Sequence, residues 1–169
     1  EVTITGFAKG SGMIKPNMAT MLAYVFIDAQ IELELLKSML DDCVNQSFNR
    51  ITVDGDTSTN DCCMLTATGK SGVVIDAQHC DIASFRSQLA SVFVDLATGL
   101  IKDAEGASKF VTVDVSGGAN VDECLKVAYC VAESPLVKTA LFASDPNWGR
   151  ILAAVGLSRL HIIRCRRTT

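Results

Sequence analysis

Hydrophobic and polar positions along the chain predict an alternation of strands and helices. Near the start, Val2 and Ile4 begin a strand-like alternation of apolar and polar residues. Residues 21–27 form a continuous apolar run that Asp28 ends, which predicts a buried strand. In residues 32–48, apolar side chains recur every three or four positions, as they do in an amphipathic helix.

The middle of the chain predicts two short strands and a long helix. Residues 63–69 predict a second strand that ends at Gly69, and residues 73–75 a short partner across the Lys-Ser-Gly turn. Asp81 is the expected N-cap of a long helix that continues to about residue 101. The expected core face of this helix consists of Phe85, Leu89, Val92, Phe93, Leu96 and Leu100.

The last third of the chain predicts one strand and then helices. Residues 109–115 alternate in strand fashion, and Ser-Gly-Gly closes that strand. Asn120 or Asp122 is expected to cap the helix that follows, and Pro135 to interrupt it. The helices are predicted over residues 122–133, 136–143 and 148–155. This order of elements indicates a mixed α/β or α+β fold.

Composition narrows the class of protein. The chain has 169 residues, of which 49% are hydrophobic and 20% charged, so it is expected to form a globular domain. A net charge of −4 argues against binding to nucleic acid, and the basic cluster Arg164-Cys165-Arg166-Arg167 is expected to be a solvated end. No signal peptide or membrane-length apolar run is present, so a cytoplasmic protein without membrane contact is predicted.

Cysteine usage agrees with an intracellular protein. The seven cysteines are odd in number and show no CxxC or Cys/His spacing, so no metal site is expected. Reduced and mostly buried thiols are predicted instead.

Two polar segments between apolar runs invite a functional interpretation. Lys9-Gly-Ser-Gly lacks the spacing of known phosphate loops, so it is a weak candidate for phosphate binding and a better one for a close backbone approach. Asp54 to Asp61 has the oxygen-rich side chains of a calcium loop, but Thr59 and Leu65 stand where an EF-hand needs Gly and Glu. A simple turn and a loop that supports a site both remain open.

Two further features carry candidate chemistry. Glu105, at the end of the long helix, is either a solvated residue or a ligand-facing one. Ala19-Thr20 places a small residue before a hydroxyl at the mouth of a strand. A threonine becomes a nucleophile when its own α-amine serves as base, and that requires cleavage of the preceding peptide bond.

Four segments of the chain resemble, in order, those of the ornithine acetyltransferase family, the bifunctional proteins of arginine biosynthesis. The first, Lys-Gly-Ser-Gly-Met-Ile-x-Pro-Asn-Met-Ala-Thr-Met-Leu, is similar to the family's self-cleavage segment. The second contains Asp-Gly-Asp-Thr-Ser-Thr-Asn-Asp, the third Asp-Ala-Glu-Gly-Ala, and the fourth Ser-Asp-Pro-Asn-Trp-Gly-Arg. The four segments are residues 9–22, 47–61, 103–109 and 134–150.

The resemblance implies a reaction and a set of site residues. Family members move an acetyl group from N-acetylornithine to glutamate, and some also use acetyl-CoA as a co-substrate; no other cofactor is expected. Thr20 matches the catalytic nucleophile, and Ala19–Thr20 matches the bond whose self-cleavage yields an α and a β chain. Lys9, Thr20 and Glu105 match substrate-binding positions. A heterotetramer of the two kinds of chain is also implied.

The resemblance further implies a layered α/β fold, with helices outside the sheets, similar to β-aminopeptidases and to N-terminal-nucleophile enzymes. Residues 1–19 are expected to end the α chain and 20–156 to begin the β chain in the same domain. Residues 157–169 depart from the family pattern and are expected to be an atypical tail. Since the chain starts with Glu and lacks the family's upstream oxyanion Thr-Gly, which Thr5-Gly6 does not match, an internal fragment is expected. A related self-processing aminopeptidase and an inactive fragment are the alternatives.

Overall fold

The computed structural model describes residues 1–15, 21–57, 62–78 and 81–167, and of residues 159–167 only the backbone. The chain divides into two compact units, Glu1–Gly106 and Ala107–Thr169. Each unit has its own apolar cluster and is described by itself.

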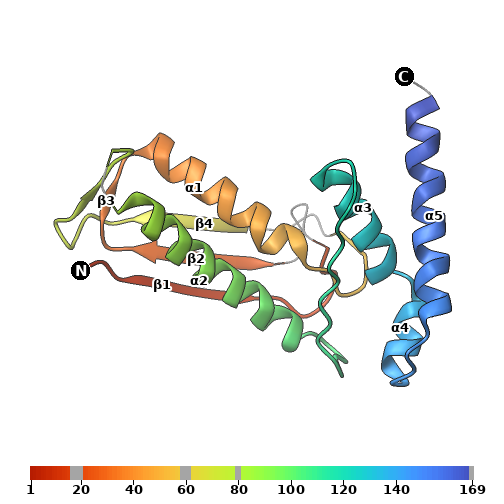
Figure 1. Cartoon of the computed structure of the whole chain (residues 1–169). Coiled ribbons are helices and arrows are strands. Elements are labelled where there is room, and N and C mark those ends of the chain that lie inside the picture. Colours follow the sequence, from red (N-terminus) through yellow and green to blue (C-terminus); the bar gives the residue numbers. More distant parts are fainter. Residues whose placement is uncertain (16–20, 58–61, 79–80, 168–169) are drawn as a thin grey trace. The chain divides into compact units, whose positions relative to one another are not determined.

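The first unit is built on a three-stranded sheet with the order β1-β2-β4 (Figure 1). Its strands are β1 (Ile4–Lys9), β2 (Leu22–Ile27) and β4 (Cys62–Ala67). β1 runs antiparallel to β2, and β4 runs parallel to it. In this register Lys9, Leu22 and Cys62 form one row across the end of the sheet. The strand expected at the start of the chain is therefore confirmed, and so are those at residues 21–27 and 63–69, within two residues at each end.

A second, two-stranded sheet corrects one expected pairing. β3 (Gln30–Ile31) and β5 (Val74–Ile75) pair in parallel, so the strand expected at 73–75 does not pair with its predecessor across the turn. Gly69 and Gly72 both have a positive φ, near +70°, which directs the chain away from β4. The backbone N–H of Gln30 donates to the carbonyl of Val73 at 2.8 Å and extends this pairing.

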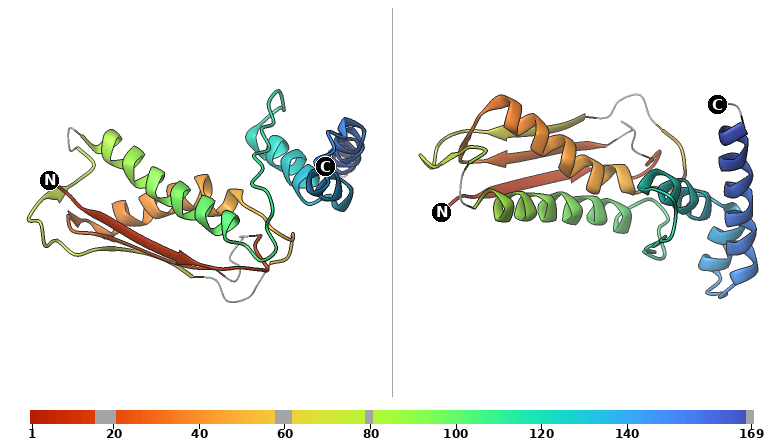
Figure 2. Two further views of the ribbon diagram at one scale, coloured as in Figure 1. Left: turned by 90° about the horizontal axis from the view of Figure 1, so that it is seen from below. Right: turned by 45° about the horizontal axis from the view of Figure 1, so that its top comes forward.

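Two helices, α1 (Leu33–Gln46) and α2 (Ile82–Lys102), lie side by side on one face of the three-stranded sheet (Figure 2). A short 3-10 turn, η1 (Phe48–Arg50), follows α1. The core between sheet and helices is closely packed, and the Phe48 and Phe93 rings meet edge to face at 5.8 Å. Completely buried side chains in this core include Ala23, Val25, Ile27, Phe48, Leu89 and Phe93. Each large one contributes about 1.5–3 kcal/mol relative to exposure.

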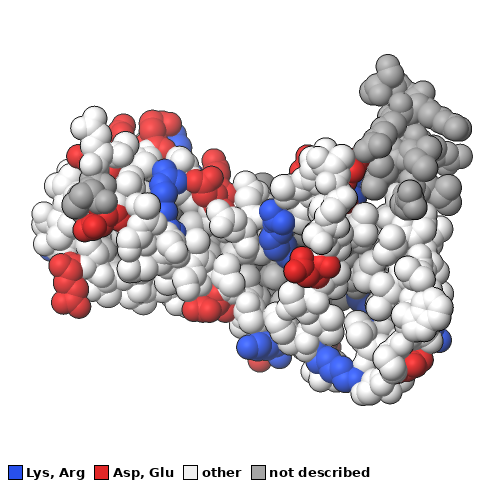
Figure 3. All heavy atoms as spheres, viewed as in Figure 1, with Lys and Arg blue, Asp and Glu red and all other residues white. Residues whose placement is uncertain are grey.

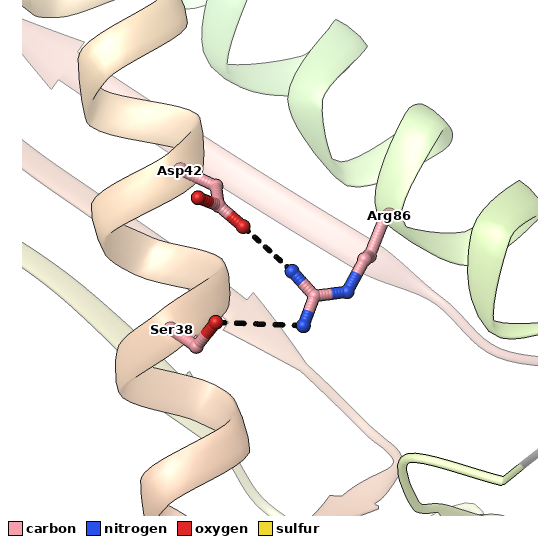
Figure 4. A network of polar contacts seen from close by, with 3 residues as sticks. All are labelled: Ser38, Asp42 and Arg86. Atoms are coloured by element: carbon pink, nitrogen blue, oxygen red, sulfur yellow. Dashed lines mark hydrogen bonds and ion pairs between the residues drawn. The ribbon is translucent and has the colours of Figure 1, made fainter.

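Polar contacts also join the two helices on their outer side. The Arg86 guanidinium on α2 forms an ion pair with Asp42 on α1 at 2.7 Å and donates a weaker hydrogen bond to Ser38 (Figure 4). Because the pair is partly exposed, it contributes less than about 1 kcal/mol. The apolar face of α2, including the predicted Leu89, Phe93 and Leu100, packs into the core of the first unit.

The expected capping of α2 is wrong in one respect. The helix begins where it was expected, but Asp81 has φ −101° and ψ 13° and its side chain makes no capping hydrogen bond. An N-cap side chain reaches the first-turn N–H groups from an extended backbone, which Asp81 does not have.

The other face of the three-stranded sheet carries exposed aromatic side chains. Phe7 stacks on Tyr24 and Phe26, with ring centroids 5.3 and 6.1 Å apart. Phe7 is 57% exposed and Met64, on the neighbouring strand, is 49% exposed. Lys9 lies on this face too, because alternate residues of a strand point the same way.

The second unit consists of the helices α3 (Val121–Ala132), α4 (Pro135–Phe142) and α5 (Trp148–Arg167). Asn120 caps α3 by accepting the Glu123 N–H, which confirms the first of the two expected caps. Ser134 caps α4, whose first residue is Pro135, so the proline begins a helix as it ends the previous one.

Two expectations for this unit change. Residues 109–115 are not assigned to a strand, because the described part of the chain offers them no backbone partner. Val113 instead packs on the small cluster of Val131, Val137 and Ala154. The final helix does not stop near residue 155 and continues to Arg167.

Thiols and surface charge can be compared with the sequence. The five cysteines whose side chains the structure describes are free thiols, but only Cys43 is fully buried, so the expectation of mostly buried thiols is wrong there. On the face drawn in Figure 3, acidic and basic side chains are interspersed over the described residues.

No helix in the described ranges is both long enough and apolar enough to span a membrane.

Candidate functional site

The predicted nucleophile Thr20 and its neighbour Ala19 lie outside the described residues. The chain is described again from Met21, which is 3% exposed and directly precedes β2. Its carbonyl accepts a hydrogen bond from the Cys62 N–H at 3.0 Å. Met21, the second residue after the candidate cleavage bond, is therefore buried and hydrogen-bonded to the start of β4.

The glycine-containing loop after β1 is held by a carboxylate. The backbone N–H groups of Met13 and Ile14 donate to the two oxygens of Asp54, at 2.6 and 3.1 Å. Met13 has a positive φ of 52°, which is uncommon for a residue other than glycine. Because a protein carboxylate already accepts the Met13 and Ile14 N–H groups, these two groups are not available to an anionic ligand.

The segment that carries Asp54 makes further contacts with the same loop. The Val53 N–H donates to the carbonyl of Ile14 at 2.7 Å, and the Thr57 hydroxyl donates to that of Lys15 at 3.3 Å. Asp54 also accepts the N–H of Asp56, which is an Asx turn. The interpretation as a turn is therefore confirmed, and the turn also holds the neighbouring loop. Support of a functional site by this segment stays a prediction.

Lys9 and Glu105 belong to the same end of the first unit. Lys9 is the last residue of β1 and is exposed. The Glu105 N–H donates to the carbonyl of Ser11 at 2.9 Å, and this bond ties the segment after α2 to the loop that Lys9 begins. Glu105 is also exposed, so a cationic and an anionic side chain both face solvent near the start of β2.

Two thiols of the first unit, Cys43 and Cys63, are not activated. Burial, followed by the neighbouring Cys62 and Cys43 thiols, raises the pKa of Cys63 to about 12. Burial also raises the pKa of Cys43 to about 11, with Asp42 as the second cause. Since the thiolate is the nucleophilic form, neither cysteine is suited to attack a carbonyl near neutral pH.

Other residues of the recognised segments have structural contacts. The Lys109 ammonium in the second unit donates to the carbonyls of Leu141 and Phe142, at the end of α4, where a cation is favourable. Arg150 donates to the carbonyl of Leu136 and the hydroxyl of Thr139, at 2.9 and 3.0 Å. The third and fourth segments thus contact each other within this unit.

The described residues contain no cluster of side chains suited to bind a metal ion. No group of three or more His, Cys, Asp or Glu side chains lies close enough together there to hold an ion.

Comparisons with known proteins agree with the four sequence segments. The arginine biosynthesis bifunctional protein ArgJ of Pseudomonas fluorescens is 57% identical over 157 residues, which are 92% of this chain and 39% of that protein. The ArgJ protein of Psychrobacter arcticus is 61% identical over 155 residues, 90% of this chain and 38% of that protein. The chain thus spans about two-fifths of the length of these curated relatives.

A solved structure supports the fold. The crystal structure of the arginine biosynthesis bifunctional protein ArgJ from Bacillus halodurans has a TM-score of 0.78 and 44% identity to this chain. The match covers 82% of this chain and 66% of that one. The predicted mixed α/β class is confirmed. The model of the ArgJ family matches residues 1–168, and the chain belongs to the ArgJ family.

Proposed function

We propose that the protein carrying this chain cleaves itself between Ala19 and Thr20 and then transfers acetyl groups from N-acetylornithine to glutamate in arginine biosynthesis. The observation that carries the proposal is the convergence of Lys9, Glu105 and the Asp54-held loop at the end of the sheet where β2 begins. Membership of the ArgJ family supports it.

The first step is an acyl shift within the chain. The Thr20 hydroxyl oxygen bonds to the Ala19 carbonyl carbon, the peptide C–N bond breaks, and the departing nitrogen takes the hydroxyl proton. Water then hydrolyses the resulting ester, which leaves an Ala19 carboxylate and a free Thr20 hydroxyl. The new α-amine, with an ordinary pKa of roughly 7.7–8.0, serves as the base for later turnovers.

Acetyl transfer follows as a two-step exchange. The Thr20 oxygen attacks the acetyl carbonyl of N-acetylornithine, ornithine departs with its α-amine, and an acetyl ester remains on Thr20. The amine of glutamate then attacks this ester and leaves as N-acetylglutamate. Lys9 pairs with a substrate carboxylate, and Glu105 pairs with the side-chain ammonium of ornithine. Such pairing matters because an unpaired charge in a closed site is costly.

The proposal also covers the two chains, their assembly and their location in the cell. Residues 1–19 end an α chain and residues from 20 onward belong to a β chain, which together form a heterotetramer in the cytoplasm. Residues 157–169 remain a predicted atypical tail, although the family match extends to residue 168. The complete fold is a layered one that resembles N-terminal-nucleophile enzymes without sharing their connectivity.

The test compares nucleophile variants of the full-length protein. Thr20→Ala removes the hydroxyl and abolishes both cleavage and acetyl transfer, whereas Thr20→Ser keeps a hydroxyl and retains part of both. Thr112→Ala, at an exposed threonine of the second unit, is the matched control and keeps both activities. The measurements are intact mass and transfer of labelled acetyl from N-acetylornithine to glutamate.

Each other outcome contradicts part of the proposal. A cleaved and active Thr20→Ala variant overturns the mechanism. Release of free acetate or of amino acids without transfer to glutamate identifies a hydrolase of the β-aminopeptidase kind. A wild-type protein that remains whole and transfers nothing is an inactive member of the family.

A further inference from the structure

We propose that Asp54 is a positioning residue for self-cleavage, because its segment holds the chain on both sides of the Ala19–Thr20 bond. This inference rests on the proposed self-cleavage. It assigns a role to a carboxylate that touches none of the reacting atoms and acts through residues 13–15.

On the upstream side, the Asp54 carboxylate fixes the loop. It accepts the Met13 and Ile14 N–H groups at 2.6 and 3.1 Å, and the Ile14 side chain is only 1% exposed. Thr57 adds a hydrogen bond to the carbonyl of Lys15, the last described residue before the cleavage bond. The carboxylate also stabilises the left-handed backbone of Met13, a conformation that is unfavourable without such a partner.

On the downstream side, the same segment ends in β4. The Cys62 N–H donates to the carbonyl of Met21, and Cys62 lies beside Leu22 in the parallel pairing of β4 with β2. Asp54 and Cys62 are eight positions apart in the sequence, and each holds one side of the five-residue stretch 16–20. The described parts of this segment, residues 53–57 and Cys62, thus contact the chain on the two sides of the bond, and we call residues 53–57 and Cys62 the brace.

Holding both flanks favours the acyl shift for a physical reason. The hydroxyl must approach the preceding carbonyl at reacting distance and in one orientation, and a misplacement of about 1 Å can cost a hundredfold in rate. A chain fixed at both ends has fewer alternative conformations to lose when that geometry forms. Loosening the upstream end therefore slows cleavage even when the nucleophile is intact.

The experiment follows cleavage of newly made precursor in the full-length protein. Cell-free translation with a short labelling pulse, followed by gel separation, gives the rate constant for conversion of precursor into the two chains. Asp54→Ala removes both acceptors and slows cleavage by about tenfold or more. Asp54→Asn keeps one acceptor oxygen, that of the amide, and its cleavage rate falls between those of Asp54→Ala and the wild type.

The control variant is Asp76→Asn, which makes the same change of charge at an exposed Asx turn outside the brace, where Asp76 accepts the Gln78 N–H at 2.9 Å, and it leaves the Asp54 contacts in place. It cleaves within about twofold of the wild-type rate. The graded rescue from alanine through asparagine to aspartate is a response that mere loss of folded protein would not produce.

Hydroxylamine identifies the step that is slowed. It cuts an ester formed at Thr20 and converts the Ala19 acyl group into a hydroxamate, so it accelerates cleavage only after the acyl shift has occurred. The Asp54→Ala precursor stays slow in hydroxylamine. Recovery of the wild-type rate in hydroxylamine overturns the proposal, because the acyl shift is then unimpaired.

The remaining outcomes separate this inference from the proposed function. If the wild type cleaves and both Asp54 variants cleave equally fast, the positioning role is wrong and the proposed function stands. If the wild type does not cleave, both fall. If Asp54→Ala is insoluble, Asp54→Asn decides, and a soluble Asp54→Asn protein with the wild-type rate overturns the positioning role.

Discussion

Side chains near the start of β2 divide into those that shape the loop and those that present charge to solvent. Asp54 and Thr57 accept or donate hydrogen bonds to the backbone of residues 13–15. Lys9 and Glu105 are exposed, and their positions are fixed through the backbone, by β1 and by the bond from Glu105 to Ser11. Substitutions in the first group should affect cleavage, and those in the second should affect substrate affinity.

Lys9 provides a test of the second group. Lys9→Met keeps the length and apolar stem of the side chain but removes its charge. We expect the KM values for N-acetylornithine and glutamate to rise about tenfold or more, because a charge-assisted hydrogen bond to a carboxylate contributes about 1.5–3 kcal/mol.

Steady-state kinetics of the full-length protein check this prediction. Lys70→Met, at an exposed lysine in the turn after β4, is the control and leaves the KM values unchanged. Equal KM values for Lys9→Met and the wild type would remove Lys9 from the substrate site.

The role of Asp54 shows what the sequence could and could not predict about single residues. Its Asx turn is local, and the spacing of Asp, Gly and Asp indicates it. Its bonds to Met13 and Ile14 join residues 40 and 41 positions apart, and no local pattern predicts such a contact. Lys9 and Glu105, by contrast, stood out through their local sequence only as weak candidates, and their substrate-binding role came from the resemblance to the family.

Helices and strands were predictable where the pattern of apolar residues within the element marks the face that is buried. The periodic apolar positions of α1 and α2 placed both helices within two residues of their ends. The pairing of residues 73–75 and the strand at 109–115 could not be predicted in this way, because a strand depends on a partner elsewhere in the chain.

The close packing of α2 on β1 can be tested at Gly6. A methyl group there would lie 2.9 Å from Cδ1 of Leu96 and 3.3 Å from Cγ2 of Val25. Leu96 can rotate its terminal methyl away, so Gly6→Ala lowers the free energy of unfolding by about 1 kcal/mol. Gly6→Val adds two more methyl groups and costs about 2–3 kcal/mol, since the helix must move.

Gly99→Ala is the matched control on the same helix. A Cβ at Gly99 meets no atom within 4 Å, so alanine fits and increases stability by about 0.5–1 kcal/mol through its better helix propensity. Urea unfolding of the full-length variants gives these values. A Gly6→Val protein as stable as the wild type would show that α2 does not press on β1.

For the chain as a whole, the sequence predicted the family more fully than it predicted the three-dimensional contacts. The four segments identified the ArgJ family because their residue types and order are specific. The division into two compact units and the exposed aromatic face of the sheet came only from the structure. An exposed apolar face of this kind is unusual for a free-standing surface.

The proposed chemistry joins the start of the second strand, the loop before it and the brace into one self-processing centre. Intact-mass analysis of the full-length protein, before and after incubation with N-acetylornithine alone, measures both steps of that chemistry on one sample. We predict two chains separated between Ala19 and Thr20, and a gain of one acetyl group on the chain that begins with Thr20. A single uncut chain, or an acetyl group located on any residue other than Thr20, would contradict the account.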